Sequence, residues 1–229
     1  MVQLYNPNKV DLAKVVAKSF ILGSCFLVNC GLILLQYYQY MTGSIYLINL
    51  YLIVLTVFHL LEFVSTCLWN NSEVEDDSFI LEDYQMMAVN IIAISEYTIT
   101  RYWKPFNLPL CYAGIGLIVV GQFARTLAMY TAGASFNHYI QRDHQEKHKL
   151  VTHGAYRLIR HPSYFGFWWW FIGLQLMVNN IVTLAVGGVI LWRFFNARIE
   201  FEEALLVKFF GSDYVKYRAE TRTWIPFIN

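Results

Sequence analysis

The charged residues of this chain leave three long windows empty. No Asp, Glu, Lys or Arg occurs in the 43 residues of 19–61, the 20 of 105–124 or the 32 of 161–192. A helix that crosses a bilayer needs about 20 mostly apolar residues, so each window is long enough for a crossing. Charged residues make up 14% of the chain and apolar residues 57%, which is unlike a soluble domain. We therefore expect an all-α, polytopic integral membrane protein.

About six transmembrane helices are expected. Three of them lie at about 15–37, 45–69 and 109–131, with a tight turn at Gly43 and Ser44 between the first two. The segment at about 79–100 is a further span, interrupted by acidic residues that we expect to face other helices: Glu82, Asp83 and Glu96.

The last window is too long for one simple helix. Asn179 and Asn180 lie near its middle, which favours a helical hairpin over 164–196. Phe201, Leu205 and Phe209 then recur at a spacing of four and predict a separate amphipathic helix that ends near Gly211.

The distribution of Lys and Arg predicts the orientation. Six spans put both termini on one side, and thirteen basic residues would lie there, against Arg101 and Lys104 on the other side. The positive-inside rule makes that side cytosolic. We thus divide the chain into 1–131, with about four spans, and 132–229, a catalytic region with a cytosolic loop, the hairpin, the amphipathic helix and the tail.

Several kinds of site are excluded by the sequence. The net charge of +1 comes with no basic face for nucleic acid, and the four cysteines suit neither disulfides nor zinc. His144 and His148 have the spacing of helical zinc ligands but lack an H-E-x-x-H motif, so we expect no metal. No G-x-G-x-x-G motif follows a strand-like segment, so a cofactor must bind at the membrane surface, between helix ends and loops.

Arg125 is the first candidate for function, because it lies in a segment that is otherwise typical of a membrane span. A charge at the bilayer centre costs about 2.5–3.5 kcal/mol, so such residues are usually paired or functional. Glu62 and Glu96 are possible partners. The alternative is that Arg125 reaches the nearby interface by snorkelling.

The second candidate is the polar cluster that precedes the tryptophan run of residues 168–170. His161 before Pro162 predicts a helix that begins at Pro162 or Ser163, whose free amides would form a site for an anion. We interpret the tryptophans as an interfacial anchor.

Arg198 and Glu202, four residues apart, are the third candidate. On composition alone, a plain surface ion pair is the alternative to a functional role.

Three segments together resemble the isoprenylcysteine carboxyl methyltransferases of the endoplasmic reticulum membrane. They are GQFARTLAMYTAGASFNHYIQ, HKLVTHGAYRLIRHPSYFGFWWW and RIEFEEALLVKFFGSDYVKYRAETRTWIPFI. The resemblance covers roughly 114–229. Its R-H-P-x-Y element also occurs in phospholipid N-methyltransferases and some sterol reductases, whereas the first hundred residues match only in hydrophobic pattern.

The resemblance implies S-adenosyl-L-methionine as methyl donor and the carboxylate of a C-terminal prenylated cysteine as acceptor. The partners would be CaaX-type proteins such as Ras-like GTPases, or a lipidated pheromone, at the cytosolic face of a multi-pass endoplasmic reticulum protein. It also implies that Arg198 and Arg125 bind the substrate and that the catalytic residues are Arg125, Arg198 and Glu202. The implied donor contacts are Gln141, His148, Lys149, Leu150, Val151, Tyr156, His161, Pro162, Ser163, Tyr164 and Glu202.

Two other functions stay open from the sequence. A phospholipid N-methyltransferase must deprotonate an ammonium, so a base would suit it better than a pair of arginines. A non-catalytic membrane receptor or transporter could use the same spans without binding a methyl donor.

Overall fold

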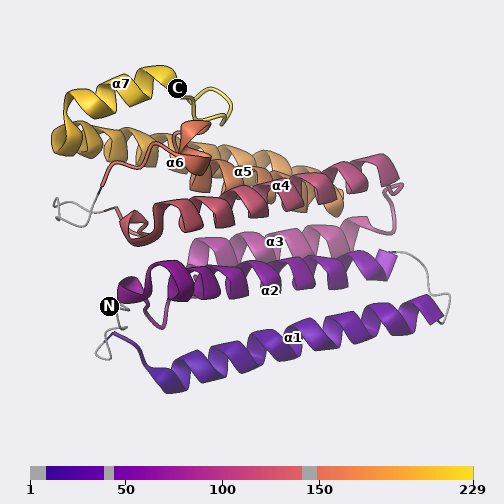
Figure 1. Ribbon diagram of the computed structural model, residues 1–229. Coiled ribbons are helices and arrows are strands. Elements are labelled where there is room, and N and C mark those ends of the chain that lie inside the picture. The colour runs from indigo at the N-terminus through magenta and orange to yellow at the C-terminus, as the bar shows by residue number, and fades with distance from the viewer. Residues whose placement is uncertain (1–8, 39–43, 141–148, 229) are drawn as a thin grey trace.

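The computed structural model describes residues 9–38, 44–140 and 149–228, and its regular structure there is helical apart from one isolated bridge between Ile159 and Arg222. Six long helices run side by side, and the short α7 lies over the end of α6 (Figure 1). Their bounds are α1 Leu12–Tyr38, α2 Ser44–Trp69, α3 Tyr84–Thr100, α4 Leu108–Ala132, α5 Pro162–Met177, α6 Ile181–Phe210 and α7 Ser212–Glu220, with three short 3-10 turns, η1 Asn71–Glu73, η2 Gly133–Ser135 and η3 Gly154–Arg157.

Four stretches of the described chain are long and apolar enough to cross a membrane: Leu12–Tyr38, Leu47–Trp69, Leu108–Ser135 and Ile181–Phe210. α3 has 17 residues and α5 has 16, fewer than the roughly 20 of a full crossing. The all-helical prediction is therefore confirmed, and the count of six spans stays a prediction. The tight turn expected at Gly43 lies outside the described residues.

Glycines allow α4 and α5 to pack with their backbones in contact. A Cβ atom on Gly121 would lie 2.5 Å from the carbonyl oxygen of Gly166 and 2.5 Å from the amide nitrogen of Trp170. Only a residue without a side chain fits such an approach. The close packing brings Arg125, one turn beyond Gly121, against the start of α5.

The predicted hairpin is present, and α3 holds its turn. Asn179 adopts a left-handed conformation with φ 59°. The carboxylate of Glu96 in α3 accepts hydrogen bonds of 2.7–2.9 Å from the amides of Ile181, Val182 and Thr183, the first residues of α6. A carboxylate at a helix N-terminus satisfies free amides and the helix dipole. Glu96 thus faces another helix, as predicted, but it is not the partner of Arg125.

Two predicted helix bounds are wrong. α3 begins at Tyr84 rather than near Phe79, because the side chain of Asp83 caps it by accepting from the amides of Gln85 and Met86. The separate amphipathic helix expected after Asn196 is instead the second half of α6, which continues to Phe210 and ends at Gly211 with φ 55°.

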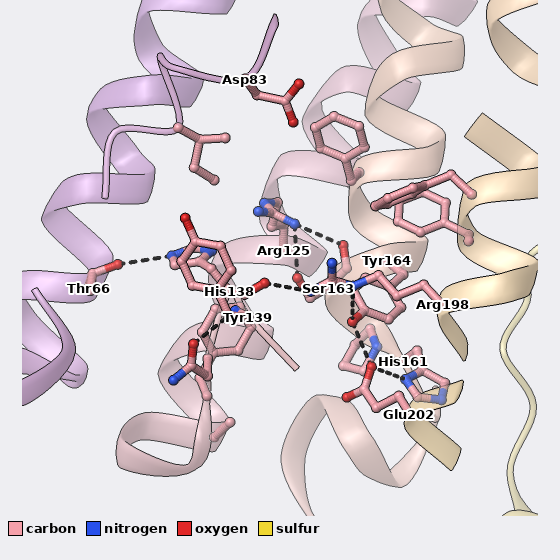
Figure 2. A pocket seen from close by; sticks show the side chains of 18 of the residues that line it. Thr66, Asp83, Arg125, His138, Tyr139, His161, Ser163, Tyr164, Arg198 and Glu202 are labelled. Carbon is pink, nitrogen blue, oxygen red and sulfur yellow. Dashed lines mark hydrogen bonds and ion pairs between the residues drawn. The ribbon is translucent and has the colours of Figure 1, made fainter. Parts of the chain in front are cut away.

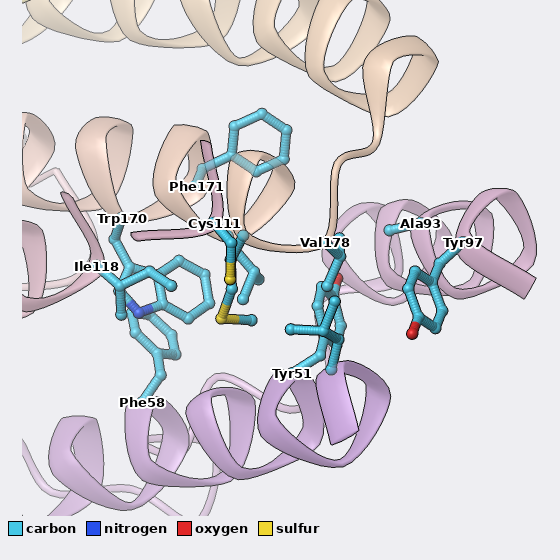
Figure 3. Close-up of a cluster of buried hydrophobic side chains, with 12 residues drawn as sticks. Tyr51, Phe58, Ala93, Tyr97, Cys111, Ile118, Trp170, Phe171 and Val178 are labelled. Carbon is cyan, nitrogen blue, oxygen red and sulfur yellow. The ribbon is translucent and has the colours of Figure 1, made fainter. Parts of the chain in front are cut away.

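Two buried apolar clusters hold the helices together. The larger joins α2, α3, α4 and α5 around Tyr51, Phe58, Trp170 and Leu174 (Figure 3). The smaller packs Ile225 and Ile228 of the C-terminal tail against Trp168, Phe195 and Ile199. Trp168 and Trp170 are 8% and 2% exposed, so interpreting them as an interfacial anchor is wrong: they are core residues of the bundle.

Candidate functional site

A cavity of about 920 Å³ lies where the start of α5, the middle of α6 and the loops after α2 and α4 meet. Near the start of α5 its lining is mostly polar, and along the facing parts of α5 and α6 it is mostly apolar. The polar lining includes Arg125, His138, Lys149, Tyr156, His161, Ser163, Tyr164, Arg198 and Glu202; the apolar lining includes Val89, Phe167, Trp170, Phe171, Leu174, Gly187, Ile190, Leu191 and Phe194. The chain thus offers one continuous space to a molecule with a polar head and a lipid tail.

The hydroxyl group of Tyr164 connects two charged residues of α6, Arg198 and Glu202, at the boundary of these parts (Figure 2). Nε of Arg198 donates to the Tyr164 hydroxyl at 2.8 Å, and that hydroxyl donates to Oε2 of Glu202 at 2.6 Å. Nη2 of Arg198 donates to the carbonyl oxygen of His138, and its Nη1 has no partner among the described residues. Arg198 and Glu202 therefore line the cavity rather than forming a plain surface pair.

All three guanidinium nitrogens of Arg125 donate hydrogen bonds. Its Nε and Nη2 bind the two carboxylate oxygens of Glu62 in α2, the second at 2.8 Å, while Nη1 donates to Oγ of Ser163 at 3.0 Å. Arg125 is 8% exposed and Glu62 1%. This bidentate geometry is the strong form of a buried ion pair, so the pairing with Glu62 is confirmed and snorkelling is wrong.

His138 links the two arginines. Its Nε2 lies 3.3 Å from the hydroxyl of Thr66 and its Nδ1 lies 3.8 Å from Oε2 of Glu62, while its carbonyl oxygen accepts from Arg198. Burial lowers the pKa of His138 to about 4, against the opposing attraction of Glu62. The imidazole is therefore neutral at pH 7, which keeps a further positive charge away from the two arginines.

A second buried ion pair fixes the start of α5 against the C-terminal tail. Arg160 binds Oε1 of Glu203 through Nε, and its Nη1 donates to the carbonyl oxygen of Thr221. The same Glu203 oxygen lies 3.1 Å from Nε2 of His161. His161 makes no capping bond to α5 with its side chain. Its ring stacks on Tyr164 instead, with the centroids 5.5 Å apart.

Two tyrosines beside the cavity are held in the neutral form. Burial raises the pKa of Tyr156 and, first among several causes, raises that of Tyr217 to about 12. The Tyr217 hydroxyl donates to the carbonyl oxygen of Tyr156 at 2.6 Å, which fixes the loop on which Tyr156 lies.

The structure brings together nearly every residue singled out from the sequence. Arg125, Arg198, Glu202 and the described residues predicted to contact the donor all line the one cavity: Lys149, Leu150, Val151, Tyr156, His161, Pro162, Ser163 and Tyr164. Gln141 and His148 lie outside the described residues. Within the described residues, no group of three or more His, Cys, Asp or Glu side chains is placed to hold a metal ion.

Three residues with a part in this site were missed or undervalued from sequence. His138 belongs to the polar cavity wall, and Arg160 and Glu203 support the start of α5 behind it. A charge inside an otherwise apolar segment is a signal that can be read from the sequence, and Glu62, which ends the first charge-free window, has it. His138, Arg160 and Glu203 lie outside such segments and lack that signal. Nothing in the sequence indicates that the carbonyl group of His138 meets Arg198.

Comparison with known proteins settles the family. The sequence profile of the isoprenylcysteine carboxyl methyltransferase (ICMT) family matches residues 114–208. Protein-S-isoprenylcysteine O-methyltransferase of Saccharomyces cerevisiae is 39% identical over 186 residues, which are 77% of this chain and 78% of that protein. Its Homo sapiens counterpart is 32% identical over 231 residues, 98% of this chain and 78% of that protein. This chain belongs to the isoprenylcysteine carboxyl methyltransferase family.

The fold agrees with that assignment. The solved structure of a eukaryotic intramembrane Ras methyltransferase, ICMT, matches with a TM-score of 0.85 at 32% identity, over 91% of this chain and 74% of that one. The chain is therefore a membrane protein of a methyltransferase family, and the predicted family is confirmed.

Proposed function

We propose that this protein transfers a methyl group from S-adenosyl-L-methionine to the C-terminal carboxylate of a prenylated cysteine. The observation that carries the proposal is the position of Arg198, Tyr164 and Glu202, in one hydrogen-bonded row where the polar part of the cavity meets the apolar part. A water-soluble donor and a lipid-linked acceptor can both reach such a boundary.

The polar walls suit S-adenosyl-L-methionine. The donor carries an ammonium, a sulfonium and a carboxylate. Glu202 supplies negative charge for the cations, and the α5 amides that His161 leaves uncapped suit the carboxylate. Backbone groups of 149–151 and the Tyr156 hydroxyl are polar partners for the adenosine part. When bound, the donor supplies a methyl group activated by the positive sulfur.

Arg198 is the group that we assign to the acceptor carboxylate. Its Nη1 has no hydrogen-bond partner in the described part of the chain, whereas all three guanidinium nitrogens of Arg125 donate to Glu62 or Ser163. We therefore assign Arg125 a positioning role: it holds Ser163, and with it the start of α5, rather than touching substrate. Glu62 shares that role.

The apolar part of the cavity suits the prenyl chain. Aromatic and aliphatic side chains of α5 and α6 form its walls, among them Phe167, Leu174, Ile190 and Phe194. Each buried CH₂ group contributes about 0.8 kcal/mol, so a polyprenyl tail has a large driving force to enter. We propose that the tail enters sideways from the bilayer, between helices.

The reaction needs no general base. The acceptor carboxylate has an ordinary pKa near 3.5 and is already ionised at neutral pH. One carboxylate oxygen forms a bond to the methyl carbon as the carbon–sulfur bond breaks. The electron pair of the broken bond stays on sulfur, so the products are a methyl ester and a neutral thioether. The task of the protein is to hold oxygen, carbon and sulfur in line, which can contribute several kcal/mol.

The remaining assignments follow the same proposal. The partners would be CaaX-type proteins, including Ras-like GTPases or a lipidated pheromone, at the cytosolic face of the endoplasmic reticulum membrane. The cavity mouth, both termini and the loops of 132–163 would be cytosolic, with six crossings in total and the catalytic region beginning near residue 132.

The experiment is an incubation of purified protein in detergent with radiolabelled S-adenosyl-L-methionine and N-acetyl-S-farnesylcysteine. We expect a methyl ester that is released as methanol by base. Label in phosphatidylethanolamine instead would favour a phospholipid N-methyltransferase. Absence of both products, with no binding of S-adenosylhomocysteine in calorimetry, would favour a receptor or transporter.

A further inference from the structure

The apolar part of the cavity follows one face of α6. Residues of α6 that line the cavity recur every three or four positions, as one helix face requires, and the last toward the hairpin turn is Gly187. Gly187 lies eleven residues before Arg198, a distance of about 16 Å along the helix axis at about 1.5 Å per residue. On α5, Phe171 and Leu174 line the same deep end.

Gly187 and Phe171 touch there. A Cβ atom on Gly187 would lie 2.7 Å from Cζ of Phe171 and 3.6 Å from both Cε atoms. Figure 3 shows the Phe171 ring directed away from the rest of the cluster, toward α6. Glycine at this position lets the ring lie against the α6 backbone. Any side chain would force the ring to move, and the cavity beside it offers the space.

The neighbouring residue provides a contrast. A Cβ atom on Gly188 would meet only Cδ1 of Ile172, at 4.0 Å, an ordinary van der Waals contact. Glycine weakens a helix interior relative to alanine, so two successive glycines in α6 are a cost to the helix. At Gly187 a glycine is required because the Phe171 ring lies where a side chain would be. At Gly188 a methyl group would fit without moving any neighbour.

We propose that the Gly187–Phe171 contact sets the depth of the apolar cavity and thereby the length of prenyl chain that the protein prefers. The proposal rests on the proposed function, because it assumes that the prenyl chain fills this space. An isoprenoid that differs by one five-carbon unit differs at its far end, and Gly187 and Phe171 lie at the end remote from Arg198.

The test compares kcat/KM for three acceptors with the same head: the N-acetylcysteine thioethers of geranyl, farnesyl and geranylgeranyl. Gly187→Ala should lower the ratio of geranylgeranyl to farnesyl activity about tenfold, the discrimination that an apolar pocket achieves for a small change in ligand size. The geranyl substrate should be affected least. Gly188→Ala makes the same chemical change in the same helix turn and should leave the ratio unchanged.

The opposite change sharpens the test. Phe171→Leu shortens the side chain at the deep end and should raise the ratio of geranylgeranyl to farnesyl activity. Combining it with Gly187→Ala should restore the ratio toward that of the original protein, because leucine gives the new methyl group room.

The results separate this inference from the function on which it rests. Equal loss on all three acceptors in Gly187→Ala would overturn the inference, since it describes a general effect on folding. The same ratio change in Gly188→Ala would also overturn it, because that variant leaves the contact with Phe171 intact. If the unaltered protein methylates none of the three acceptors, the proposed function itself fails.

Discussion

Arg125 and Arg198 line the same cavity, but the protein treats them in opposite ways. Arg125 is 8% exposed and lies in a closed bidentate pair with a carboxylate that is 1% exposed. Arg198 has no such pair within residues 9–38, 44–140 and 149–228: there it donates to a tyrosine hydroxyl and a backbone carbonyl, and its Nη1 makes no hydrogen bond. Arg125, whose charge is balanced by a carboxylate, stabilises the structure. Arg198, which is bonded to neutral groups, can still attract an anionic ligand.

The difference arises from the helices that face each arginine. Arg125 projects from α4 toward α2, where Glu62 is the only charged residue of the helix. Arg198 faces the loop after η2 and the start of α5, and Tyr164 stands between it and Glu202. The bridging hydroxyl separates the two charges, so the guanidinium is oriented without being neutralised.

The largest effect should come from breaking the closed pair. Glu62→Ala leaves the Arg125 guanidinium buried without a counterion, which costs about 3–5 kcal/mol of stability. We expect a clear fall in the midpoint of thermal unfolding in detergent micelles. Glu200→Ala, an exposed residue of α6, serves as the control and should change the midpoint little.

A double variant separates stability from activity at this pair. Glu62→Leu with Arg125→Met removes both charges and should recover most of the stability, because buried ion pairs can be replaced by apolar groups of similar volume. Activity should stay low, since Ser163 has lost its donor. Full activity in the double variant would contradict the positioning role of Arg125.

Removing the guanidinium of Arg198 should lower the catalytic rate. Arg198→Ala should lower kcat/KM about 100- to 1000-fold, as expected when one preorganised donor to the reacting group is lost. Arg198→Lys should not restore it, because lysine cannot donate to Tyr164 and a carboxylate with the same planar geometry.

The matched control for Arg198 is Arg193→Ala, which removes a charge from the same helix at a residue that is not part of the described cavity lining. The unfolding midpoint of Arg198→Ala should stay near that of the original protein. Activity within threefold of normal would mean that Arg198 does not meet the acceptor.

A smaller effect is expected from the hydroxyl between the charges. Tyr164→Phe keeps the stacking on His161 and Phe195 but removes hydrogen bonds to two charged groups, each worth about 1.5–3 kcal/mol. We expect kcat/KM to fall about 10- to 100-fold. Tyr139→Phe, which removes an exposed hydroxyl from the same cavity, should have little effect, and equal losses in the two variants would argue against a special role for Tyr164.

The smallest effect concerns the neutral histidine between the arginines. The pKa of His138 is lowered to about 4 in the folded protein, against an ordinary value of about 6.5. Between these two pH values His138 binds a proton in the unfolded chain but not in the folded protein. The free energy of unfolding therefore decreases as the pH is lowered, by about 0.7 kcal/mol from pH 7 to pH 6. Thermal unfolding of the original protein and of His138→Gln across this range should show the difference. Identical pH dependence would mean that His138 is not held neutral.

Much of this molecule follows from local sequence. The charge-free windows locate the long helices, because a bilayer segment and a helix of about 20 residues impose the same length. Pro162 begins α5 and Gly211 ends α6 as expected, since both residues act through the backbone of their own turn. The motifs of 121–228 are sufficient to indicate the family, whose relatives share 32–39% of their residues with this chain.

The prediction from local sequence was wrong at two helix bounds and at the tryptophans. Asp83 starts α3 later than its apolar pattern suggests, and the second half of α6 continues the hairpin helix because no Gly or Pro interrupts residues 189–210. The tryptophans of 168–170 look interfacial in sequence, yet Trp168 and Trp170 are core residues because α5 is covered on several sides.

The sequence by itself determined that the chain is helical, where most of its helices begin and end to within a few residues, and which polar residues belong to one functional region. Only the tertiary structure decided which arginine is neutralised and which stays available. The physical reason is that the spacing of residues along a chain specifies a helix face, whereas the state of a buried charge depends on the partner that another helix places against it. Glu62 and Tyr164 are 63 and 34 residues from the arginines whose roles they set.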